Sequence, residues 1–216
     1  MVDYDQIVLF LIHISKLSNF NELFLNMCGE LKTLPNIISK LKRFEGLTLR
    51  MANFYQIIFL PSSISKLSNF KELIFDMYGK LETLPNTISE VKRFEGLNLR
   101  SCKSLHILLP SISNLISLQI LLKVNCDQIV LLPSPIYKLS NLKELILDMC
   151  GELETLPNTI SNLSKLLEFI LDRNYKSLQI LSPSISILTS LQIIIAVDFD
   201  QLLQLFNLKE SVLDRL

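Results

Sequence analysis

The chain has 216 residues, of which 49% are hydrophobic, and its 21 basic side chains balance its 21 acidic ones. Because segments that stay unfolded are poor in apolar residues and rich in net charge, this composition excludes a disordered chain. The zero net charge also argues against a nucleic-acid binder that works through bulk charge. With only 5 Gly, 2 His and no Trp, the chain has little material for a phosphate-binding loop or a catalytic cleft.

Residues 1–5 carry two aspartates and no basic residue ahead of the apolar run 7–14, so the N-terminal segment does not read as a signal peptide. The longest uncharged run, residues 177–197, approaches the length of a membrane span. It contains a proline and two glutamines, however, and it recurs in step with residues 104–124. The four cysteines are too few for a disulfide scaffold. We therefore expect a cytoplasmic protein without a membrane span.

An internal repeat runs through the chain at intervals of 23 to 26 residues. Its marker is Leu-Pro-x-x-Ile or a near variant, and Leu11 takes the place of the proline ahead of Ile14 in the first unit. The marker prolines stand at positions 35, 61, 85, 110, 133, 157 and 183. Each unit continues with the same spaced apolar residues, and from Ile136 to Pro157 it reads I-x-x-L-x-x-L-x-x-L-x-L-x-x-C-x-x-L-x-x-L-P. So many coinciding positions indicate a repeat architecture.

A single unit of this kind cannot bury its own leucines. We expect one short parallel strand per unit, with alternating leucines such as Leu145 and Leu147 pointing inward. A return segment would start at the proline, where no ladder N–H is needed. Stacked neighbours would then close a continuous apolar core.

These residues resemble the leucine-rich-repeat signature L-x-x-L-x-L-x-x-N/C-x-L, in about eight units that cover nearly all of the chain. The resemblance implies an α/β solenoid: a leucine-rich-repeat horseshoe with a parallel concave sheet and short helical or irregular convex segments, formed by residues 1–216 as a single domain. Leu-Pro-x-x-Ile with Cys in the N/C position, the ladder position, most resembles the repeats of plant intracellular nucleotide-binding resistance proteins. Ras-binding scaffold repeats also carry Leu-Pro-x-x-Ile, usually with Asn in the ladder position.

Neither end of the chain shows the pattern of a complete repeat. Residues 2–9 match residues 124–131, so we expect the chain to start midway through a repeat without an N-terminal cap. Residues 207–216 leave the pattern, and an apolar residue recurs there at every fourth position from Leu208. This spacing predicts a short amphipathic C-terminal cap helix, with an incomplete ninth unit as the alternative.

The fifth unit departs from the pattern because Lys123 falls in an inward leucine position, where an unpaired charge is costly. Either the strand slips by one residue, so that Ile120, Leu122 and Val124 face inward, or Lys123 reaches out to solvent. We favour the slip, which also puts the orientation of the similar eighth unit in doubt.

No catalytic or metal site is apparent from the pattern. Cysteines occupy the ladder position in four units, at Cys28, Cys102, Cys126 and Cys150. Stacking places such side chains about 4.8 Å apart along a row, whereas thiolates that bind one metal converge to about 2.3 Å from it, so we favour a structural role. His13 and His106 belong to different units and lack triad partners, and no phosphate-loop motif occurs. We expect no enzymatic activity, no cofactor and no metal.

The informative surface is the predicted concave sheet, where strand positions between the inward leucines face solvent. Three rows of residues cross the units at these positions. The first row is Glu22, Gly46, Glu72, Gly96, Ile120, Glu144, Glu168 and Ile193. The second row is Phe24, Thr48, Ile74, Asn98, Leu122, Ile146, Ile170 and Ile195. The third row is Asn26, Arg50, Asp76, Arg100, Val124, Asp148, Asp172 and Val197.

The second row is unusually apolar for a water-facing position, and contiguous exposed apolar surface usually marks an interface. Strand propensity alone is the competing explanation, and we favour the interface. In the third row, Arg50, Asp76 and Arg100 alternate in sign, which fits cross-strand pairing and partner binding equally well. The residues expected to contact a protein partner are Glu22, Phe24, Ile74, Asp76, Arg100, Glu144, Ile146, Asp148, Ile170 and Asp172.

The leading hypothesis is a non-enzymatic protein-recognition module that presents this concave sheet to a protein ligand or to a neighbouring receptor domain, and not to nucleic acid. The family resemblance implies the ligand-sensing or autoinhibitory repeat region of an intracellular plant immune receptor. Two alternatives stay open: a freestanding signalling scaffold of the Ras-binding leucine-rich-repeat type, and a truncated gene product with no retained role.

Overall fold

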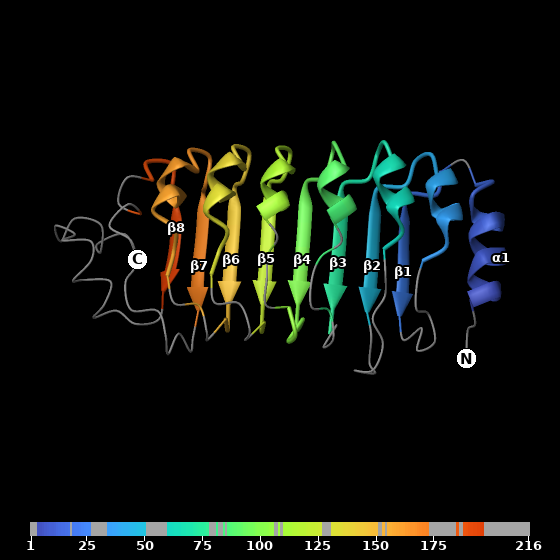
Figure 1. Cartoon of the computed structure of the whole chain (residues 1–216), viewed down its shortest axis with the longest axis horizontal. Coiled ribbons are helices and arrows are strands. Elements are labelled where there is room, and N and C mark those ends of the chain that lie inside the picture. The colour runs from blue at the N-terminus through green and yellow to red at the C-terminus, as the bar shows by residue number, and fades with distance from the viewer. Residues whose placement is uncertain are drawn as a thin grey trace.

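Eight short parallel strands lie side by side in one open sheet, in chain order, within the described part of the chain (Figure 1). The computed structural model describes residues 4–17, 19–26, 34–50, 60–77, 81, 84, 86–105, 108, 110–126, 131–150, 153, 155–172, 185 and 188–196. The strands are β1 Glu22–Asn26, β2 Gly46–Arg50, β3 Glu72–Asp76, β4 Gly96–Arg100, β5 Ile120–Val124, β6 Glu144–Asp148, β7 Glu168–Asp172 and β8 Ile193–Ala196. The predicted solenoid with a parallel sheet is therefore confirmed.

Short 3-10 helices form a second layer on one face of the sheet (Figure 1). They are η1 Asn36–Lys40, η2 Ser62–Lys66, η3 Asn86–Glu90, η4 Pro110–Asn114, η5 Ser134–Lys138 and η6 Asn158–Asn162. Pro35, Pro61, Pro133 and Pro157 stand at the N-caps of four of them, in extended backbone conformation. A proline fixes φ and cannot continue a preceding helix, so these four return segments begin at their marker prolines.

The first unit is different, because residues Tyr4–Ile14 form the α-helix α1 at the N-terminal end of the solenoid (Figure 1). Ile7, Leu11 and Ile14 are buried and belong to the common core, at the spacing of an amphipathic helix. Leu11 stands where the other units carry proline, so the helix runs through this position without interruption. The return segment of the first unit is therefore an α-helix, whereas the later units form 3-10 helices.

The core is a row of side chains shared between neighbouring units. The second and fourth residues of the strands point inward, as Leu145 and Leu147 do, and both are buried. Phe20, Phe44, Phe70 and Phe94 continue the core just before the first four strands, with ring centroids 6.2, 5.7 and 5.8 Å apart in succession. Each ring thus packs against rings of adjacent units, which couples the stability of each unit to that of its neighbours.

The fifth strand does not slip. Lys123 pairs in register with Leu99 on one side and Leu147 on the other, and its side chain is 0% exposed. Its Nζ donates to the carbonyl of Cys126 at 3.3 Å. A one-residue slip would move every side chain of β5 to the opposite face and expose the buried Leu121, so the strand keeps its register and buries the amine. The predicted slip was wrong, and the eighth strand is also in register, with Ile194 opposite Phe169.

The predicted cap helix over residues 207–216 and its alternative, a ninth unit, lie outside the described residues. The single domain over residues 1–216 stays a prediction. Among the residues that the structure describes, no helix has the length and apolar character that a membrane crossing requires.

Replacing Lys123 with Met is expected to stabilise the chain. The substitution keeps a long flexible side chain but removes the cost of burying an amine among leucines, which we expect to raise the free energy of unfolding by roughly 1–3 kcal/mol. Urea denaturation of the two proteins measures the difference. Lys143→Met, which changes an exposed lysine, controls for the change of charge. A lower unfolding midpoint for the Lys123 variant would show that the hydrogen bonds of the amine outweigh its burial.

Candidate recognition surface

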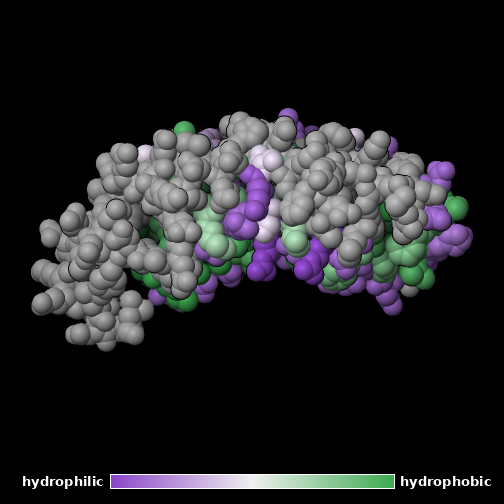
Figure 2. Space-filling view, turned by 90° about the horizontal axis from the view of Figure 1, so that it is seen from below, coloured by the Kyte–Doolittle hydropathy of each residue, from purple (hydrophilic) through white to green (hydrophobic). Residues whose placement is uncertain are grey.

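The open face of the sheet carries the three predicted rows in the predicted order. The register pairs Glu22 with Gly46, Phe24 with Thr48 and Asn26 with Arg50, and the same offsets continue to β7. The molecule is an arch, and hydrophobic and hydrophilic residues lie side by side on its inner side (Figure 2). The rows therefore form the concave face of the solenoid, with Ile195 closing the second row in β8 and Val197 outside the described residues.

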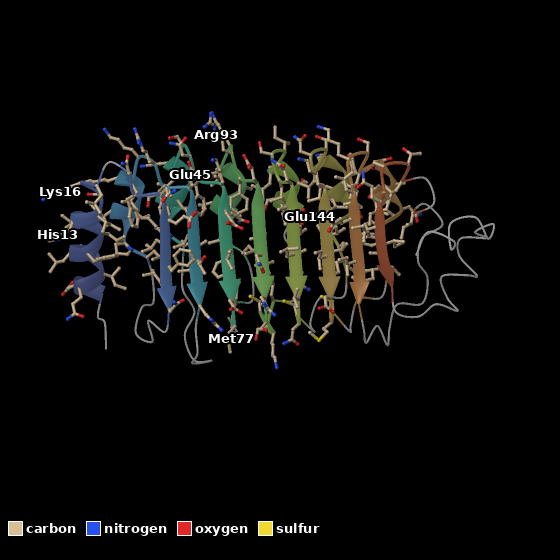
Figure 3. The ribbon with its side chains drawn as sticks, turned by 180° about the vertical axis from the view of Figure 1, so that it is seen from behind. His13, Lys16, Glu45, Met77, Arg93 and Glu144 are labelled. Carbon is tan, nitrogen blue, oxygen red and sulfur yellow. The ribbon has the colours of Figure 1, made fainter. Side chains whose placement is uncertain are left out.

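All ten predicted contact residues stand at concave positions. Glu22, Phe24 and Arg100 are exposed, and Phe24 keeps 61% of its surface accessible. The half-buried ones are Ile74, Asp76, Glu144, Ile146, Asp148 and Ile170. Asp172 occupies the register position next to Asp148, at the end of β7. In the view onto this face, Glu144 lies on β6, Glu45 and Arg93 lie at the edge where strands begin, and Met77 lies at the opposite edge (Figure 3).

An apolar strip covers the concave side of β5–β7. It consists of Ile120, Leu122, Val124, Ile146 and Ile170, all half-buried. Three of these residues come from β5 and were assigned to the interior by the predicted slip. Leu118, Leu121 and Cys126 keep the spacing of the other units around Lys123, and this pattern favours the observed register. The cost of burying the amine of Lys123 favours the slip, so the sequence alone does not decide between the two.

Carboxylates flank this apolar strip on β6 and β7. Glu144 stands opposite Glu168 in the first row, and Asp148 stands opposite Asp172 in the third. Like charges directly opposite each other on neighbouring strands are destabilising. Glu144 and Glu168 are thus a like-charged pair on neighbouring strands whose placement costs folding stability.

The concave face as a whole is acidic, although the chain is neutral. From β1 to β7 the rows hold four glutamates and three aspartates against two arginines, Arg50 and Arg100. Arg50 Nε lies 3.2 Å from Asp76 Oδ2, so part of the third row is used in cross-strand pairing. Arg100 is exposed.

Glycines make room for glutamates in the first row of β1–β4. A Cβ on Gly96 would lie 3.3 Å from Cγ of Glu72, and a Cβ on Gly46 would lie 3.4 Å from Cγ of Glu22. The side chain of Glu72 therefore leans over the backbone of the next strand. Burial, followed by the charge of Glu22, raises the pKa of the Glu72 carboxyl.

A cysteine follows each of β4, β5 and β6 by two positions. The intervening residues Ser101, Asn125 and Met149 have φ values of 55, 55 and 49°, a left-handed turn that points the chain back toward the core. The three thiols, Cys102, Cys126 and Cys150, are buried.

The thiols act as hydrogen-bond donors to backbone carbonyls. Cys126 Sγ lies 3.3 Å from the carbonyl oxygen of Leu99, and Cys150 Sγ lies 3.6 Å from that of Lys123. Cys126 and Cys150 thus tie consecutive units together, which supports the structural role for these two residues, while Cys102 Sγ lies 3.7 Å from the carbonyl oxygen of Arg100 in its own unit. Cys28 and His106 lie outside the described residues, and His13 is exposed on α1, with Nδ1 2.6 Å from the carbonyl of Leu9. Among the described residues, no three His, Cys, Asp or Glu side chains gather as a metal site.

Solved structures with the same architecture include the leucine-rich repeat domain of the type III effector XopL, which superposes with a TM-score of 0.62 at 23% identity over 84% of this chain and 70% of that one. The chain has the leucine-rich-repeat fold. A chain of the Toll-Spatzle complex of Drosophila superposes with a TM-score of 0.67 at 19% identity, over 90% of this chain and 27% of that one. At these identities the likeness establishes the fold alone. No family model and no curated protein matches the sequence.

The thiol of Cys150 is expected to be unreactive in the folded chain. Burial raises its pKa to about 11, so at pH 8 the nucleophilic thiolate is scarce as well as inaccessible. We expect alkylation by iodoacetamide to be slower than in the urea-unfolded chain by about a hundredfold or more, as measured by mass spectrometry of the peptide that contains Cys150. Equal rates in the two states would contradict the buried position.

Glu72→Gln is expected to stabilise the protein near neutral pH. A carboxyl whose pKa is raised by folding is more easily protonated in the folded state than in the unfolded state, so its ionisation weakens the folded state as pH rises through the folded pKa. The amide lacks this penalty, and the gain in melting temperature should shrink below about pH 4, where both side chains are neutral. Glu90→Gln, an exposed change on η3, is the control. A gain that is equal at both pH values would attribute the effect to something other than ionisation.

Proposed function

We propose that the chain is a non-enzymatic protein-recognition module that binds its partner on the concave sheet. The apolar strip of β5–β7 carries this proposal, because Leu122, Ile146 and Ile170 lie side by side on the open face and remain partly accessible. Contiguous exposed apolar surface of this kind usually marks an interface. The curvature of stacked repeats also creates the extended concave surfaces on which solenoid proteins bind their partners.

The acidic residues around the apolar strip support the same proposal. Strand propensity explains an isoleucine on a strand, but it does not explain like-charged pairs such as Glu144 and Glu168, which disfavour folding. A partner of complementary charge offsets this cost on binding. Phosphate-rich ligands meet repulsion on the same face, so we propose a protein partner and not a nucleic acid.

We further propose that the module is the ligand-sensing or autoinhibitory repeat region of an intracellular immune receptor in plant defence. The support for the receptor class is the motif Leu-Pro-x-x-Ile with a cysteine in the ladder position, which resembles the repeats of such receptors. The support for the compartment is that the thiols of Cys126 and Cys150 donate hydrogen bonds to backbone carbonyls, which suits a reducing compartment such as the cytoplasm. A nucleotide-binding domain encoded upstream in the same reading frame would favour this receptor over a freestanding scaffold. Unbroken register through the fifth unit argues against a decayed gene product.

The function is tested by capture of partner proteins from a lysate of the source tissue. Ile146→Asn combined with Ile170→Asn makes the apolar strip polar without adding charge, and we expect it to abolish capture of the proteins that the unmodified chain retains. The matched control is Ile116→Asn combined with Leu131→Asn, which changes two exposed apolar residues outside the three rows. Circular dichroism establishes that both variants fold. If the two variants retain the same proteins, the concave face is not the binding surface.

A further inference from the structure

The apolar strip and its flanking carboxylates define the chemistry of a partner. Along β6 and β7, an acidic residue precedes the central isoleucine by two positions and another follows it by two positions. The third strand of the strip, β5, is apolar at all three concave positions. A matching ligand therefore needs an apolar centre with positive charge on both sides.

The spacing of the apolar strip matches an α-helix lying across the strands. Leu122, Ile146 and Ile170 stand on adjacent strands. Measured along the row from Leu122, Ile146 therefore lies about 4.8 Å away and Ile170 about 9.6 Å away. On a helix, residues i+3 and i+7 lie about 4.5 and about 10.5 Å from residue i along the axis. An extended segment presents one face only every second residue, at about 6.7 Å, which falls out of step with the strands.

The width of the face fits the same occupant. The first and third rows lie four residues apart along each strand, or about 13 Å, and a helix with its side chains is about 10–12 Å across. A helix centred on the second row would thus have Glu144 and Glu168 along one flank. The positions of Asp148 and Asp172 would run along the other flank.

We propose that the apolar strip binds an amphipathic helix of a partner protein, lying across β5–β7, whose apolar stripe is bordered on both sides by lysine or arginine. The proposal deepens the recognition function above and rests on it. Groove-bound helices commonly use anchors at i, i+3, i+4 and i+7, and the flanking charges set the orientation and selectivity of binding. An acidic or uncharged helix of the same apolar pattern is then a poor ligand.

Three synthetic peptides of equal length test the proposal against the full chain. The first has leucines at i, i+3, i+7 and i+10 with lysines on both borders, the second has glutamates in place of the lysines, and the third is the lysine peptide with a central proline. Fluorescence anisotropy should show binding of the first peptide, with affinity that falls as salt rises. We expect the glutamate and proline peptides to bind roughly tenfold more weakly or worse. Circular dichroism should show a gain of helix when the lysine peptide binds.

Two double variants locate the site. Glu144→Lys combined with Glu168→Lys should abolish the preference for the lysine peptide over the glutamate peptide, because two lysines then balance the aspartates at the ends of β6 and β7. Glu22→Lys combined with Glu72→Lys makes the same change of charge in the same row, but on β1 and β3, and should leave the preference unchanged. Melting curves of both variants show whether each retains its fold.

Four results would each overturn the proposal: equal affinity for the lysine and glutamate peptides, undiminished affinity for the proline peptide, equal effects of the two double variants, or no binding of the lysine peptide at about 1 mM, the weak end of specific affinities. If such a result accompanies protein capture that still depends on Ile146 and Ile170, only the helical partner is excluded. If capture does not depend on these residues, the recognition function of the concave face fails as well.

Discussion

The structure depends on burial that each repeat shares with its neighbours. A typical unit contributes a five-residue strand and a short 3-10 helix, and these two elements alone leave the leucines between them open on both sides. Their burial requires the equivalent leucines of the adjacent units, as the pairing of Leu121 with Leu97 and Leu145 illustrates. Because a slip of one residue would expose every inward side chain of a strand, the stacked core holds all eight strands in one register.

This constraint determines how single residues behave. Lys123 is buried because the register of β5 is set by its inward neighbours, and one amine with a carbonyl partner costs less than the exposure of a whole strand face. Cys126 and Cys150 take the inward position after their strands and reach carbonyls of the preceding unit. In the first unit, where no proline interrupts the return segment, the same need for burial is met by one face of α1.

The constraint also leaves the concave positions outside the core. Since the inward positions supply the core, the outward positions can carry residues that are unfavourable for the sheet, such as the opposed pair Glu144 and Glu168. The result is a neutral chain with an acidic inner surface and an apolar strip across β5–β7. Such a surface favours a partner that combines apolar anchors with positive charge, and it discriminates against acidic ones.

Much of this arrangement follows from the sequence alone. The spacing of the leucines and marker prolines determines one strand per unit, the parallel order and the three concave rows, because the inward leucines recur at the same positions in unit after unit. The ten predicted contact positions follow from the same alternation. The sequence does not reveal that Lys123 is buried or that Ile120, Leu122 and Val124 face outward, since the local cost of burying an amine points to a slip. Nor does it reveal that residues 4–14 form one helix, because they match a repeat segment. Tertiary structure decided these features. The free energy of a strand register, or of a helix packed at the end of the stack, is a sum of contacts with neighbouring units, and no single segment of sequence contains those contacts.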